Sequence, residues 1–177
     1  MKKKIICAAL LTALVCGAES CGNNSTPAKT TTAAPAATTA AVTEAAKSDA
    51  KAADVTKAIL DEITINSAFE KSKESLEDYF DGLDISTISD SSYYICASGA
   101  YPDEIAVFKF DSADSAKNAV AAVNDRLDYQ KTTYKDYTPE EYYKLEDAVV
   151  EQSGEWLYYL VTSDNTKAKE IVNGFIG

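Results

Sequence analysis

Tyrosine and glutamate side chains gather between positions 134 and 143, in a segment whose other residues are largely polar. Tyrosine has a flat, rigid ring with a polar hydroxyl at its tip, so a cluster of tyrosines suits recognition of a protein or glycan surface. The alternative is that these rings pack over the edge of the hydrophobic core. The segment supplies our candidate binding residues, which are Tyr134, Tyr137, Glu140, Tyr142 and Tyr143.

Carboxylates in the same region suggest hydrolysis as a second kind of chemistry. Glycosidases need only two carboxyl groups, so a neighbouring pair could serve a small hydrolase. The neighbouring pairs are Glu140 with Glu141 and Asp103 with Glu104. Because adjacent residues do not point into one cleft merely by adjacency, we expect no catalytic residues and no enzyme activity.

Metal, cofactor and nucleophile chemistry is poorly supported. The chain has no histidine, which removes the commonest general base and the commonest zinc ligand. Its acidic clusters do not reproduce the twelve-residue calcium loop, so we expect no metal site and no cofactor. Cys96 has no histidine to activate it and is expected to be a small buried apolar residue. The acidic residues considered are Asp81, Asp84, Asp111 and Asp114.

The charge balance excludes nucleic acid as a partner. The 177-residue chain has 17 basic and 28 acidic residues and a formal net charge of −11. Nucleic-acid binding requires a cationic surface, and anionic lipid head groups attract one too. The single arginine, Arg126, also cannot form an arginine clamp on phosphate.

Cys21 is the residue with the clearest covalent chemistry. It follows Lys2 to Lys4, an apolar run over residues 5–15, and the small residues Ala18 and Ser20. This pattern resembles a bacterial lipobox, in which the cysteine thiol is diacylglycerylated and becomes the new N-terminus. An ordinary secretory signal cleaved near Ala18 is the alternative. We expect a signal peptide over residues 1–20 and a membrane anchor at Cys21, on the extracytoplasmic face of the cell membrane.

A low-complexity spacer is expected over residues 21–47. Beyond its first few residues it consists almost entirely of threonine, alanine, proline, serine and valine, with no aromatic residue to bury. Such a segment cannot repay the entropy of ordering and is expected to be a disordered tether. The composition typical of a folded domain is found in residues 48–177, and this length is enough for one domain.

Apolar spacing predicts the helices of this domain. A first helix, capped by Ser48, has an apolar stripe at Ala52, Val55, Ile59 and Ile63. A short helix around Leu76 ends at Gly82. A third helix begins after a cap at Asp111 or Ser112 and ends before the tyrosine-rich connection. The last helix is capped by Ser163. The buried positions of the last two helices are Ala116, Val120, Val123, Leu127, Ala168, Ile171, Val172, Phe175 and Ile176.

Four strands are predicted at 92–97, 105–110, 148–151 and 156–161. Short turns at 99–103 and 152–155 indicate two hairpins, and hairpins make an antiparallel sheet. The predicted order is helix, helix, strand, strand, helix, strand, strand, helix. We therefore expect an α+β fold with an antiparallel four-stranded sheet and helices packed on one face.

The folded part also resembles a known family. The resemblance lies in DEIAVFK at 103–109, in YKDYTPEEYYKLEDAVV at 134–150, and in the final hairpin and helix. These segments are similar to small secreted lipoproteins of Gram-positive bacteria that carry the domain of unknown function 4358. The resemblance implies an extracytoplasmic location and supplies no catalytic residues.

These observations favour a non-enzymatic, lipid-anchored binding or accessory module of the cell envelope. The expected partners are the membrane, through the diacylglyceryl anchor, and an envelope protein or glycan. Two alternatives stay open, which are a small carboxylate-dependent hydrolase of wall polymers and a solute-binding lipoprotein. A solute-binding receptor usually closes two lobes on its ligand, whereas one domain is expected here.

Overall fold

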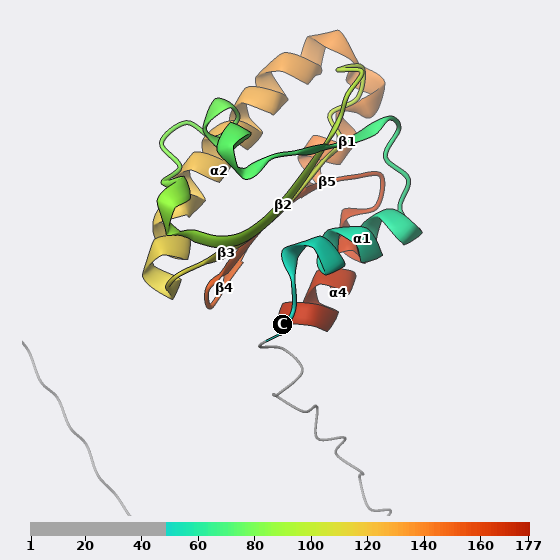
Figure 1. The fold of residues 1–177 in the computed structure, drawn as a ribbon. Coiled ribbons are helices and arrows are strands. Elements are labelled where there is room, and N and C mark those ends of the chain that lie inside the picture. Colours follow the sequence, from blue (N-terminus) through green and yellow to red (C-terminus); the bar gives the residue numbers. More distant parts are fainter. Residues whose placement is uncertain (1–48) are drawn as a thin grey trace, which may run out of the picture. The chain divides into compact units, whose positions relative to one another are not determined.

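A five-stranded antiparallel sheet organises residues 49–177, the part of the chain that this computed structural model describes (Figure 1). The expected signal peptide, Cys21, the spacer and Ser48 lie outside the described residues. In spatial order the strands are β1 (Ala68–Lys71), β2 (Ile88–Cys96), β3 (Glu104–Phe110), β5 (Trp156–Val161) and β4 (Val149–Ser153). The two predicted hairpins, β2–β3 and β4–β5, are confirmed.

The prediction of four strands was wrong, because β1 adds a fifth at one edge of the sheet. β1 pairs with β2 from Ala68 opposite Cys96 to Lys71 opposite Tyr93. Three of its four residues are exposed and the fourth is half-buried, so it has none of the apolar alternation that marks a half-buried strand. Backbone pairing alone therefore identifies it as a strand.

The sheet is covered on both faces, so the prediction of helices on one face was also wrong. Figure 1 shows α2 (Ala113–Tyr137) on one side and α1 (Ala52–Glu62) with α4 (Asn165–Ile176) on the other. Strand residues alternate between two separate cores, as the pleat requires. In β3, Ala106 and Phe108 join the core under α2, whereas Ile105 and Val107 join the core under α1 and α4.

Two of the predicted helix caps were wrong. Lys51, not Ser48, precedes α1, and the backbone N–H of Ala52 donates to the Asp90 carboxylate at 2.8 Å. The expected cap Ser112 is confirmed at α2, where its side chain accepts from the N–H of Ser115. At α4 the cap is Asp164 rather than Ser163.

Short 3₁₀ helices connect β1 to β2. η2 (Lys73–Asp78) contains Leu76, around which a short helix was expected, and Gly82 after it adopts a φ of +77°. That left-handed conformation favours glycine, as the sequence indicated. η3 (Ile85–Thr87) follows and leads into β2.

α2 is longer than predicted and absorbs part of the tyrosine-rich connection. The expected apolar stripe ends at Leu127, but Gln130 and Tyr134 continue it at steps of three and four residues, and both are buried. The Tyr134 hydroxyl donates to the backbone carbonyls of Gly99 and Tyr101, each at 3.0 Å. The chain then passes through η4 (Pro139–Glu141) and α3 (Tyr143–Glu146), and Pro139 is the first residue of η4, a position that suits proline.

Candidate functional site

A buried ion pair joins the first residue of β3 to the middle of α2. The Arg126 side chain binds the Glu104 carboxylate with two donors: Nε donates to Oε2 at 3.2 Å and Nη2 donates to Oε1. The side chains of Glu104 and Arg126 are 3% and 14% exposed. This two-donor geometry fixes the direction of the guanidinium as well as its charge.

The Glu104 carboxylate is buried close to two buried tyrosines. Burial raises the pKa of the Glu104 carboxyl, and the Arg126 guanidinium opposes that shift. Burial, followed by the negative charge of Glu104, also raises the pKa of Tyr93 and Tyr159, so both phenols stay neutral. Arg126 is therefore the group that makes a charged Glu104 tolerable in the core.

Arg126 also lines a surface pocket of about 320 Å³ between η2 and α2. The guanidinium carbon lies 5.4 Å from the ring centre of Tyr79 and 5.5 Å from that of Tyr129. Tyr79 is half-buried, whereas Tyr129 is 63% exposed. The residues that line the pocket are Glu77, Asp78, Tyr79, Asp81, Asp125, Arg126 and Tyr129.

Four carboxylates surround these aromatic rings. All four are exposed, and none forms an ion pair within residues 49–177. The charge of Arg126 is already balanced by Glu104, so the pocket has an excess of hydrogen-bond acceptors. The four residues are Glu77, Asp78, Asp81 and Asp125.

The five tyrosine and glutamate residues predicted to bind do not form one surface. Tyr134 is buried and Tyr142 packs against the core under α2. Tyr137 and Tyr143 are 66% and 47% exposed, and Glu140 is exposed as well. The expectation that Tyr134 and Tyr137 lie in a loop was wrong, because both belong to the last turns of α2.

The carboxylate pairs considered for hydrolysis are separated by their partners. Asp103 pairs with Lys144, whereas its neighbour Glu104 pairs with Arg126. Glu141 also pairs with Lys144, and Glu140 is exposed. Neither adjacent pair therefore presents two free carboxyl groups to one cavity.

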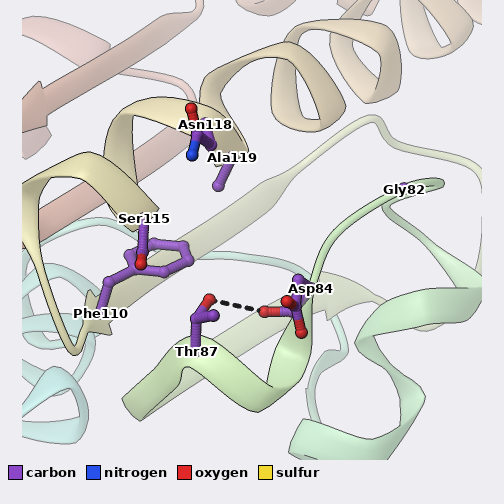
Figure 2. Close-up of a pocket in the computed structure, with 7 residues that line it drawn as sticks. All are labelled: Gly82, Asp84, Thr87, Phe110, Ser115, Asn118 and Ala119. Atoms are coloured by element: carbon purple, nitrogen blue, oxygen red, sulfur yellow. Dashed lines mark hydrogen bonds between the residues drawn. The ribbon is translucent and has the colours of Figure 1, made fainter.

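A second, smaller cavity of about 120 Å³ lies between the segment around η3 and the start of α2 (Figure 2). Its polar groups already serve local structure: the Thr87 hydroxyl donates to the backbone carbonyl of Asp84 at 2.8 Å, and the Asp84 carboxylate accepts from the Ser86 N–H. Pockets for small molecules usually measure about 300 Å³ or more, so this cavity is small for a ligand.

Cys96 and the acidic clusters were the remaining candidates for chemistry. Cys96 is buried, and its sulfur lies 3.1 Å from the Ser98 hydroxyl. Across residues 49–177, no three acidic or cysteine side chains converge as a metal site would require. No helix in that same part of the chain is long and apolar enough to cross a membrane.

Comparison with protein families gives a match over residues 62–162 to a domain of unknown function, DUF4358. The chain belongs to the DUF4358 family. The matched DUF4358 segment contains all five strands and α2, and with them the pocket and both buried ion pairs, whereas α4 lies outside it. Comparisons with curated proteins and with solved structures found no match.

We expect Arg126→Gln to lower the free energy of unfolding by about 3–5 kcal/mol at pH 7, because it leaves the buried Glu104 carboxylate without its cation. A buried carboxyl with a raised pKa binds a proton more readily in the folded state. The loss should therefore shrink as the pH falls toward 5. Urea denaturation at pH 5.5 and pH 7 measures both values.

The matched control is the double variant Glu104→Gln with Arg126→Gln, which removes both charges. It should retain more stability at pH 7 than the single variant and should lose the pH dependence contributed by Glu104. An equal loss for Arg126→Gln at both pH values would contradict the assigned ionisation of Glu104.

Proposed function

We propose that this protein is a lipid-anchored, extracytoplasmic binding module of the cell envelope that performs no chemistry on its partner. Its binding site is the pocket between η2 and α2 that Arg126 helps to line. The observation that carries the proposal is the joint placement of Tyr79 and Tyr129 beside a fixed guanidinium, in a cavity of about 320 Å³. That volume lies at the lower end of the range for small-ligand sites.

The chemistry of the pocket favours an envelope glycan as the ligand. Tyrosine rings offer flat faces to the C–H side of a sugar ring, and the exposed ring of Tyr129 is accessible. Carboxylates accept hydrogen bonds from hydroxyl groups, and the guanidinium of Arg126 retains donors that Glu104 does not use. A protein partner would use the same tyrosine and arginine anchors, so the test below distinguishes the two.

The location of the protein is proposed from the sequence. The basic, apolar and small-residue pattern before Cys21 supports export and diacylglycerylation, and the spacer supports a domain held away from the bilayer. Two acyl chains bind a membrane firmly, whereas one chain binds it only marginally. The hydrolase alternative has less support, because Asp103, Glu104 and Glu141 are each engaged by a cation.

We expect Tyr129→Ala to weaken binding of residues 48–177 to insoluble cell-wall peptidoglycan by about tenfold or more, because it removes an exposed aromatic anchor. Tyr137→Ala is the matched control, since Tyr137 is also on α2 and 66% exposed, against 63% for Tyr129. Co-sedimentation measures the bound fraction, and circular dichroism shows that both variants are folded.

Equal binding by the two variants and the unchanged chain would contradict the site. A loss with Tyr137→Ala alone would instead favour the tyrosine-rich end of α2. If peptidoglycan does not bind but an envelope protein is retained in a Tyr129-dependent way, the site stands and the ligand is a protein.

We expect Cys21→Ser to abolish labelling by a palmitate analogue and to move the protein from the membrane fraction to the medium of a Gram-positive host. Cys16→Ser is the control, because Val15 before it is too bulky for a cleavage site, and it should leave labelling unchanged. Labelling that persists in Cys21→Ser, or a cytosolic wild-type protein, would contradict the anchor.

A further inference from the structure

Phe69 is a large aromatic side chain that the fold leaves exposed. It lies on β1, the edge strand of the sheet, and is 53% exposed. The other large apolar side chains exposed in residues 49–177 are Tyr129, Tyr137 and Tyr143, which all lie on helices. A single exposed apolar residue is ordinary, whereas a ring that is continuous with a pocket indicates a binding surface.

Phe69 and Lys71 point to the face of the sheet that α2 covers. Residues directly opposite one another in an antiparallel pair lie on the same face. Phe69 is opposite Ile95, and Lys71 is opposite Tyr93. Tyr93 belongs to the core under α2, and Ile95 packs against that core. The two β1 side chains therefore lie on the same side of the sheet as the pocket between η2 and α2.

Lys71 joins Phe69 to that pocket. Its Nζ lies 5.4 Å from the ring centre of Phe69 and 4.8 Å from that of Tyr79. Tyr79 in turn lines the pocket with Arg126 and Tyr129. Three aromatic rings thus alternate with two cations in steps of 4.8–5.5 Å. The resulting aromatic row has Phe69 at one end and Tyr129 at the other, and both end rings are exposed.

The ammonium of Lys71 retains hydrogen-bond donors for a ligand. Its side chain is half-buried, and none of the ion pairs within residues 49–177 includes it. A cation over a ring is attracted by the ring's quadrupole rather than by an acceptor oxygen, so the N–H groups of Lys71 can still donate to one. At the Tyr129 end of the row the free groups are acceptors instead, namely the four carboxylates of the pocket.

We propose that the aromatic row is an extended binding site for a neutral glycan chain, with Phe69 as a second stacking platform beyond the pocket. The proposal rests on the binding function proposed above and specifies its ligand as a chain of several sugar units. A run of four steps is longer than one sugar ring. One sugar therefore stacks on Tyr129, another stacks on Phe69, and an oxygen of the chain between them accepts from Lys71.

The charges along the row favour an uncharged chain. A hydroxyl group both donates and accepts, so one sugar chain can bind the carboxylates at one end and the ammonium at the other. A polyanion, such as a phosphate-linked wall polymer, would be repelled by the four carboxylates of the pocket. A protein strand added to the sheet is disfavoured as well, because β1 has only four residues and carries Glu70 and Lys71, and short, charged strands protect a sheet edge from pairing.

Isothermal titration calorimetry of residues 48–177 with the β-linked disaccharide and tetrasaccharide of N-acetylglucosamine tests the proposal. We expect the unchanged chain to bind the tetrasaccharide about fivefold or more tightly than the disaccharide, because only the longer sugar reaches a second ring. In Phe69→Ala the two sugars should bind equally.

Two further variants separate stacking from other effects of the substitution. Phe69→Leu should also lose the gain, since it keeps an apolar side chain on β1 and removes the ring. The matched control is Tyr143→Ala, which removes an aromatic side chain that is 47% exposed, against 53% for Phe69, and it should keep the gain.

Equal affinity of the unchanged chain for the two sugars would overturn the proposal, and so would a gain that survives in Phe69→Ala. If the disaccharide nevertheless binds in a Tyr129-dependent way, the pocket stands and only its extension to Phe69 fails. If neither sugar binds while peptidoglycan still co-sediments, the neutral glycan chain is the wrong ligand, and the pocket binds another part of peptidoglycan.

Discussion

The buried pair between Glu104 and Arg126 is the interaction on which the rest of this structure depends. It attaches the middle of α2 to the central strand of the sheet through two donors on one carboxylate. The same guanidinium also lies close to the rings of Tyr79 and Tyr129, and Arg126 lines the surface pocket with them. Because a buried charge is costly without its partner, one side chain couples the packing of the core to the shape of the candidate site.

A second buried cluster fixes the end of the domain next to this pair. Asp103 and Glu104 are consecutive, yet one pairs with Lys144 and the other with Arg126. α3 and α2 are thereby attached to the same end of β3. This arrangement explains why part of the tyrosine-rich segment serves the core: Tyr134 and Tyr142 pack there, and the Tyr134 hydroxyl holds the loop before β3.

Much of the fold was predictable from the sequence, because the helices carry regular apolar spacing and four of the strands are apolar or aromatic runs bounded by turns. The sequence also carried a sign that both faces of the sheet are covered. β3 and β5 are almost continuously apolar rather than alternating, as expected of strands that are buried on both faces. β1 carries no such signal. The predicted end of α2 came too early in the chain, because Gln130 and Tyr134 look like surface residues until their hydrogen-bond partners are known. Arg126 was visible as the sole arginine, but its pairing with Glu104, 22 positions away, depends on the tertiary fold.

Chemical-shift mapping on isotope-labelled residues 48–177, titrated with soluble peptidoglycan fragments, tests the central claim most directly. The account predicts that backbone amides of η2 and of α2 around Arg126 and Tyr129 shift together and saturate at one affinity. Saturating shifts confined to Tyr137, Glu140 and Tyr143, with the pocket unchanged, would contradict it.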